Sequence, residues 1–122
     1  MPQFSLTSTV LGTPDPGGLA RFYQHLLGWG IGTDEPDWVT LRPADGSAGL
    51  SFQLEEQHTP PTWPAGANEQ QMQLHLDIEV DDLAAAVAAA EAIGARQAAF
   101  QPQAGVRVML DPSGHPFCLF AD

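Results

Sequence analysis

Three side chains that could do chemistry alternate along one short stretch of the chain. His75, Asp77 and Glu79 occupy every second position of the sequence MQLHLDIEV, in which the other positions, from Met72 to Val80, are apolar. Alternation of this kind is typical of a β-strand with one buried face, so the three polar side chains share the opposite face. An imidazole beside carboxylates can act as a general base near neutral pH. The pattern therefore indicates a catalytic His75 with Glu79 or Asp77 in support, or a histidine that merely hydrogen-bonds Asp77 or a neighbouring strand.

Other residues with chemical potential stand alone in the sequence. Cys118 is the only cysteine, which excludes an intrachain disulfide and a zinc site built from several cysteines. No cation lies near it in the sequence, so we interpret it as a small buried residue rather than a nucleophile. Trp63 lies among prolines and could close over a cavity or anchor a dimer, whereas Phe120 either packs in a core or stacks on a ligand.

The amino-acid composition excludes two classes of binding partner. The chain has 122 residues and a formal net charge of −11, with four arginines and no lysine. Nucleic acids and anionic membranes require clustered cations, so we exclude both as partners. No apolar run approaches the roughly 20 residues that span a bilayer, and the first residues do not resemble a secretion signal. We therefore expect a cytoplasmic protein.

Hydrophobic periodicity and turn residues predict a single domain, 1–122, made of two similar modules. The expected elements of residues 4–55 are a strand, a helix and three strands, and residues 72–122 repeat that order after a Pro-rich linker, 56–71. The boundaries that we expect are strands at 4–11, 29–33, 38–42 and 50–55 with a helix from Pro16 to Gly28, then strands at 72–80, 96–100, 106–110 and 116–120 with a helix from Leu83 to Gly94. Matching segments lie 67 residues apart at Ser8 and His75, and 65 apart at Phe52-Gln53 and Phe117-Cys118.

Three segments, SFQLEE, LHLDIEVDDL and DPSGHPFCLF, carry a resemblance to a known family. Together with the repeated module they resemble the vicinal oxygen chelate superfamily, which includes glyoxalase I, bleomycin-resistance proteins and extradiol dioxygenases, and within it the small bacterial glyoxalase-like domain proteins. The resemblance implies an α+β fold of two βαβββ modules that form a curved mixed sheet around a U-shaped cavity. It also implies a homodimer.

The same resemblance points to four positions that hold metal in other members. They correspond here to Ser8, Gln53, His75 and Cys118. A catalytic divalent ion takes about three imidazole or carboxylate ligands, whereas this set offers a hydroxyl, an amide, an imidazole and a thiol. We therefore expect no cofactor and no metal; if a metal is present, His75 and Gln53 are the expected ligands.

Two functions remain open from the sequence. The first is a metal-independent protein that binds a small apolar or aromatic molecule in its cavity, as the bleomycin-resistance branch does. The second is a small lyase or isomerase of the glyoxalase type with His75 as general base or metal ligand. Under either reading, the residues expected to contact the ligand are Ser8, Gln53, Trp63, His75, Asp77, Cys118 and Phe120.

Overall fold

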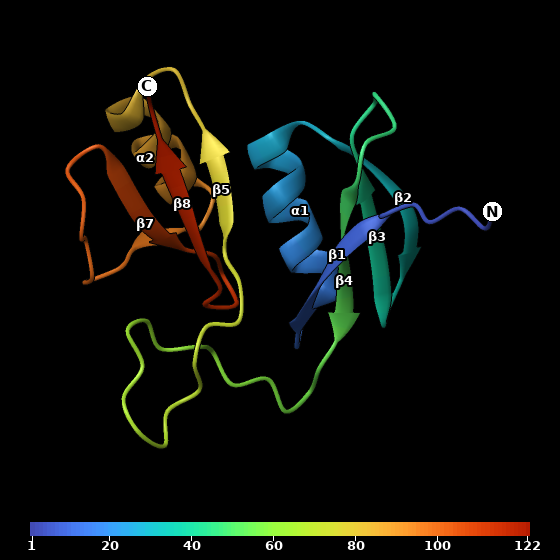
Figure 1. Ribbon diagram of the computed structural model, residues 1–122, viewed down its shortest axis with the longest axis horizontal. Coiled ribbons are helices and arrows are strands. Elements are labelled where there is room, and N and C mark those ends of the chain that lie inside the picture. The colour runs from blue at the N-terminus through green and yellow to red at the C-terminus, as the bar shows by residue number, and fades with distance from the viewer. The chain divides into compact units, whose positions relative to one another are not determined.

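The computed structural model describes all residues, 1–122, as two compact units, Met1–His58 and Thr59–Asp122. Each unit contains one helix and four strands (Figure 1). The expected linker does not stay separate, because residues 59–71 belong to the second unit. That assignment brings Trp63 into the unit that also holds His75.

The first unit follows the predicted order of a strand, a helix and three strands. Its elements are β1 (Ser8–Thr13), α1 (Pro16–Leu27), β2 (Gly30–Glu35), β3 (Trp38–Arg42) and β4 (Gly49–Leu54). The Asp15 carboxylate caps α1 by accepting a hydrogen bond from the Gly18 N–H at 3.0 Å. Gly28 ends the helix in the left-handed conformation, with a φ of 73°. The predicted limits of this helix are confirmed.

The second unit repeats the order. Its elements are β5 (Leu76–Glu79), α2 (Leu83–Ala92), β6 (Arg96–Gln97), β7 (Val106–Leu110) and β8 (Pro116–Phe120). Asp82 caps α2 through the Ala85 N–H at 3.1 Å, the same role that Asp15 has in α1. The two capping aspartates lie 67 residues apart, which confirms the repeat.

The two sheets have the same topology. Their strand orders are β1-β4-β3-β2 and β5-β8-β7-β6, with the first two strands of each order parallel and the other pairs antiparallel. The chain therefore has the predicted α+β fold of two βαβββ modules. The U-shaped cavity expected from both modules stays a prediction.

Each sheet packs one face against its own helix. In the first unit the buried core includes Tyr23 of α1 and Phe52 of β4, whose rings stack 5.9 Å apart. In the second unit Met109, Phe117 and Leu119 are buried on the corresponding face. Alternate residues of β7 and β8 consequently point to the opposite face, where a ligand can reach them.

Two predicted strands are too long at their beginnings. The strand expected at 4–11 starts at Ser8, because its ladder partner β4 begins at Gly49 and residues 4–7 have no strand beside them. The strand expected at 72–80 is limited to Leu76–Glu79. Its partner strand begins with Pro116, which has no N–H to donate to the ladder, so regular pairing starts with Leu76 and Phe117.

The strand expected at 96–100 covers only Arg96–Gln97. Beyond that point, the side chain of Gln101 rather than a β-strand lies against the neighbouring strand β7. The Gln101 amide donates to the Val108 carbonyl and accepts from the Val108 N–H, both at 2.9 Å. The Ala98 N–H still donates to the Val108 carbonyl, but the Val108 N–H bonds to Gln101 in place of the backbone carbonyl that a longer β6 would have offered.

No helix of the structure is both long enough and apolar enough to cross a bilayer. The segment before β1 exposes Phe4 and Leu6, with 92% and 79% of their surfaces accessible. The homodimer expected from the sequence stays a prediction, and such apolar side chains are the kind that an interface between copies would cover.

The close approach of β3 and β4 gives a stability prediction. A Cβ atom added at Gly49 would overlap the Leu41 carbonyl oxygen, which is a backbone atom that cannot move alone. We expect Gly49→Ala to lower the free energy of unfolding by about 1–3 kcal/mol, measured by urea denaturation. Gly30→Ala is the matched control, because nothing lies within 4 Å of an added Cβ there. Equal stability of the two variants would contradict the prediction.

Candidate functional site

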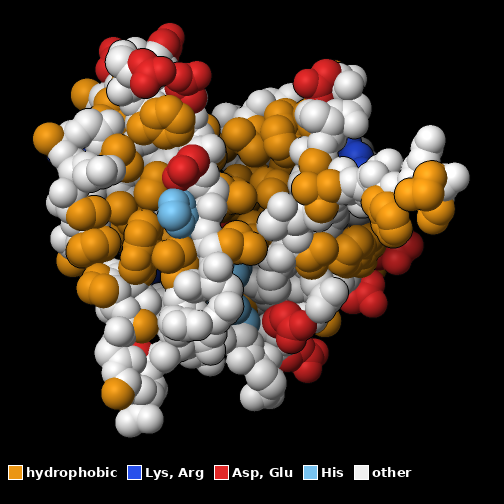
Figure 2. All heavy atoms as spheres, viewed as in Figure 1, with side chains coloured by type: hydrophobic (Ala, Val, Ile, Leu, Met, Phe, Trp, Pro, Cys, Tyr) orange, Lys and Arg blue, Asp and Glu red, His pale blue; other side chains and the backbone are white.

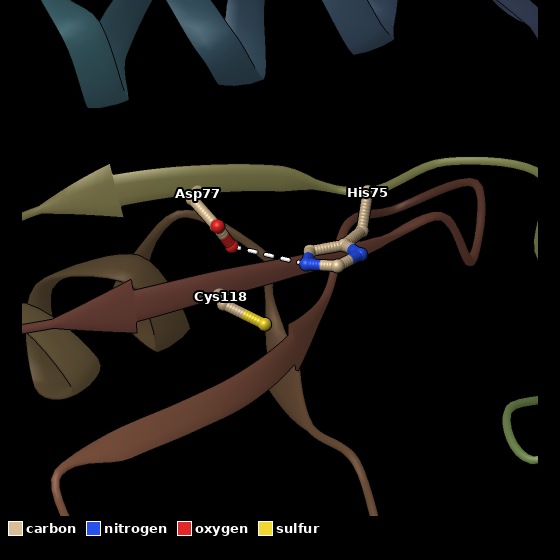
Figure 3. Close-up of side chains that lie close together, drawn as sticks. All are labelled: His75, Asp77 and Cys118. Carbon is tan, nitrogen blue, oxygen red and sulfur yellow. Dashed lines mark ion pairs between the residues drawn. The ribbon is translucent and has the colours of Figure 1, made fainter.

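His75, Asp77 and Cys118 converge on one face of the second unit's sheet (Figure 3). Asp77 lies on β5 directly opposite Cys118 of β8, and His75 immediately precedes β5. The His75 Nε2 and Asp77 Oδ1 atoms are 3.0 Å apart, and one ligand atom from each of the three residues lies within 4.8 Å of the other two. The three side chains therefore form one polar cluster.

The strand pattern explains this cluster. His75 and Asp77 are two residues apart, so they share a face of the extended chain. The parallel register of β5 with β8 then sets Cys118 beside them. The neighbours of Cys118, Phe117 and Leu119, point to the helix side and are buried there.

The environment of Cys118 keeps its thiol protonated. Burial raises the pKa of Cys118 above its ordinary value, and the negative charge of Asp77 and a hydrogen bond to that carboxylate raise it further. Reactive cysteines need a lowered pKa. The structure thus agrees with the interpretation of Cys118 as a small buried residue, here one that donates to a carboxylate.

An aromatic side chain covers the cluster. The ring of Trp63 stacks on that of His75 with centroids 4.9 Å apart and an interplanar angle of 27°. The segment that carries Trp63 is fixed by a β-bridge between Thr62 and Gln71 and by a hydrogen bond of 2.8 Å from the Thr62 N–H to the Gln70 carbonyl. Its expected roles, closing over a cavity or anchoring a dimer, stay predictions.

The cluster opens into a pocket of about 690 Å³. Aromatic and aliphatic side chains form much of its wall, and no lysine or arginine lines it. The residues that matter most for the site are Trp63, His75, Asp77, Val106, Cys118 and Phe120. In Figure 2 a histidine and an acidic side chain stand amid hydrophobic side chains over this unit. The volume lies within the range of pockets that bind drug-sized molecules.

Three further residues were predicted for the site, namely Ser8, Gln53 and Glu79. Ser8 belongs to the first unit, where its hydroxyl is 2.6 Å from that of Ser51. The Gln53 amide donates to the Glu55 carboxylate at 3.0 Å. Glu79 is exposed on β5 opposite Phe120, and the carboxylate that pairs with His75 is that of Asp77.

Ser51 is a residue that the sequence analysis missed. The pair Ser8 and Ser51 occupies the place in the first unit that His75 and Cys118 occupy in the second, and both members are shifted by 67 residues. Gln53 lies two positions further along β4, opposite Gly12. A constant shift of 67 along the whole repeat would have pointed to Ser51 rather than Gln53.

The donor set of the cluster tests whether a metal fits. One imidazole, one carboxylate and one thiol are types of ligand that zinc accepts, and three protein ligands are the usual number at a catalytic ion. However, His75 and Asp77 are already paired with each other, and the thiol holds its proton. An ion held by all three side chains would have to replace the contact between His75 and Asp77 and displace the proton of the thiol.

Comparisons with known proteins agree on the fold. A family model described as a glyoxalase-like domain matches residues 8–120. A solved structure of a glyoxalase/bleomycin resistance protein/dioxygenase family enzyme from Burkholderia phytofirmans PsJN is 20% identical, with 97% of this chain and 98% of that chain covered and a TM-score of 0.73. A glyoxalase-related enzyme from Fulvimarina pelagi is 19% identical, with 98% and 89% covered and a TM-score of 0.68. No curated protein matches the chain.

Thiol alkylation should report the effect of Asp77 on Cys118. In wild type we expect the rate of iodoacetamide labelling to rise with a midpoint above pH 9.0, the ordinary pKa of the thiol, because burial and Asp77 disfavour the thiolate. Asp77→Asn should move the midpoint to lower pH and increase the rate at pH 8, measured by mass spectrometry.

Glu79→Gln, on the same strand, is the matched control and should leave the midpoint in place. An unchanged midpoint in Asp77→Asn would contradict the assignment.

The raised pKa of Cys118 also affects stability. It favours the folded state at pH values below the pKa of the thiol in the unfolded chain, and this contribution is lost as the pH rises through the pKa of the thiol in the folded protein.

Proposed function

The chain belongs to the glyoxalase-like domain family, and from that premise we propose that it binds a small apolar or aromatic molecule without a metal. The observation that carries the proposal is the pocket of about 690 Å³, with its mostly apolar wall and one polar cluster. Sites for small molecules combine a hydrophobic lining with a few polar groups that fix the ligand's orientation. Here Asp77 and His75 supply those groups.

The side chains that line the pocket suggest how the ligand is held. Phe120 and Trp63 offer ring surfaces for an aromatic group, which such rings hold in offset or edge-to-face geometry. The Asp77 carboxylate, with 64% of its side chain exposed, can accept a hydrogen bond from a ligand hydroxyl or amine. A flat molecule with one donor group therefore fits the site.

A second candidate function is the glyoxalase-type lyase or isomerase. It is favoured by the pair of His75 Nε2 and Asp77 Oδ1 at 3.0 Å, because a carboxylate beside an imidazole orients the ring of a general base. In that case His75 removes a proton next to a carbonyl group of the substrate. Asp77 takes the supporting role, since it pairs with His75 and no ion pair joins His75 to Glu79.

Binding of an uncharged aromatic probe tests the first function. We expect metal-stripped protein to bind N-phenyl-1-naphthylamine saturably, followed by the fluorescence of the probe. Phe120→Ala should weaken binding about tenfold, because burying a phenyl ring contributes roughly 1.5 kcal/mol or more. Phe4→Ala is the control, since Phe4 is 92% exposed and lies outside the pocket. Absence of saturable binding would contradict the proposal.

Metal titration and a turnover assay together separate the two functions. By calorimetry, we expect metal-stripped protein to bind none of zinc, nickel, cobalt and manganese at one ion per chain, for the reasons given by the donor set. Tight binding that His75→Ala abolishes would overturn this expectation and make the enzyme the leading function. A metal-free enzyme would instead show turnover of an adduct between an α-oxoaldehyde and a thiol, with kcat lowered about 10²–10⁴-fold in His75→Ala.

A further inference from the structure

The second unit has another pocket on the same face of its sheet. Its volume is about 340 Å³, and it is lined by apolar side chains that include Pro61, Trp63, Ala99, Phe100, Leu110 and Pro116. Trp63 and Val108 line this pocket as well as the larger one. We refer to it as the apolar pocket.

The register of β7 with β8 shows how the two pockets are related. Three cross-strand pairs point to the ligand side in sequence along the sheet, namely Val106 with Phe120, Val108 with Cys118, and Leu110 with Pro116. The first two pairs belong to the larger pocket, whereas the third belongs to the apolar pocket. Successive pairs are roughly 7 Å apart, since they are two residues apart on a strand. The two pockets are therefore consecutive stretches of one surface.

Trp63 divides that surface. Its ring stacks on His75 in the larger pocket at 4.9 Å and lies against Phe100 in the apolar pocket at 5.5 Å, with an interplanar angle of 59°. Thr62 holds the backbone in place through its bridge to Gln71. The divider is thus a side chain whose backbone is held by a β-bridge and whose ring contacts both pockets.

The ionisable side chains are confined to one side of Trp63. The larger pocket contains His75, Asp77 and Asp122. The apolar pocket contains no charged side chain, and Thr62 is its one residue with a polar side chain. A charged group would lose its hydration there without gaining a partner, so the apolar pocket suits uncharged hydrocarbon.

We propose that the apolar pocket is a second binding subsite, which takes the uncharged apolar end of a ligand whose polar end meets His75 and Asp77. This inference rests on the proposed function and specifies its ligand as a two-part molecule, with a ring bearing a donor group and a hydrocarbon extension. A cavity of about 150 Å³ already holds benzene in an unrelated protein, so about 340 Å³ is ample for a short alkyl chain or a ring.

A series of 4-alkylphenols, from methyl to hexyl, tests the subsite by calorimetry on metal-stripped protein. The phenol hydroxyl can donate to Asp77 while the alkyl chain extends past Trp63. We expect the affinity to rise about fourfold with each added methylene, the usual effect of burying that group. Ala99→Trp should fill the apolar pocket and abolish this rise while leaving the affinity for 4-methylphenol unchanged. Ala99 is exposed, so the larger side chain can be accommodated without disturbing the fold.

Ala121→Trp is the matched control, because Ala121 lines only the larger pocket. It should weaken 4-methylphenol and 4-hexylphenol alike, and circular dichroism should show that both variants are folded. Two results would contradict the proposed subsite and leave the proposed function standing. One is that 4-methylphenol binds but the length of the alkyl chain does not change the affinity. The other is that the affinity still rises with chain length in Ala99→Trp. If no alkylphenol binds to wild type, the proposed function itself fails, and the subsite fails with it.

Discussion

The parallel pairing of the first and last strands in each module is the constraint on which the candidate site depends. A parallel pair cannot be closed by a tight turn, so the chain needs a longer crossover between β5 and β8, which here consists of α2, β6 and β7. The consequence is that residues 41 positions apart, Asp77 and Cys118, face each other across one ladder. The β5 stretch contributes the imidazole and the carboxylate, and the pairing with β8 adds the thiol.

The alternation of side chains then separates stability from function. On the helix side, Phe117 and Leu119 are buried and hold α2 against the sheet. On the ligand side, Cys118 and Phe120 line the pocket. Phe120 is only half-buried, so substitutions there can change what is bound at little cost to the core. The fold itself is shared with solved structures that are only about 20% identical.

Much of the fold could be predicted because it follows from local rules. The capping aspartates, Gly28 and the alternation around Asp77 each specify an element through its own residues. Strand ends were less predictable, since they depend on what lies alongside, such as Pro116 or the Gln101 side chain. For the site, the resemblance and the strand pattern together pointed to His75, Asp77 and Cys118 among other residues, and the structure brings these three side chains together. The contacts of Trp63 and Ser51 required the structure, because both follow from pairings between segments distant in sequence.

The two modules share a topology but differ in chemistry, and that difference bears on the ligand. Where the second unit has His75 and Cys118, the first has Ser8 and Ser51, two hydroxyls bonded to each other at 2.6 Å. The first module therefore offers neither a base nor a strong metal ligand at this position. In the second unit, the larger pocket has two charged side chains besides the ionisable His75, and both are carboxylates, those of Asp77 and Asp122. The whole chain carries a net charge of −11. A carboxylate or phosphate ligand would meet repulsion with no cation to offset it, so the site favours neutral or cationic molecules that bring a hydrogen-bond donor to Asp77.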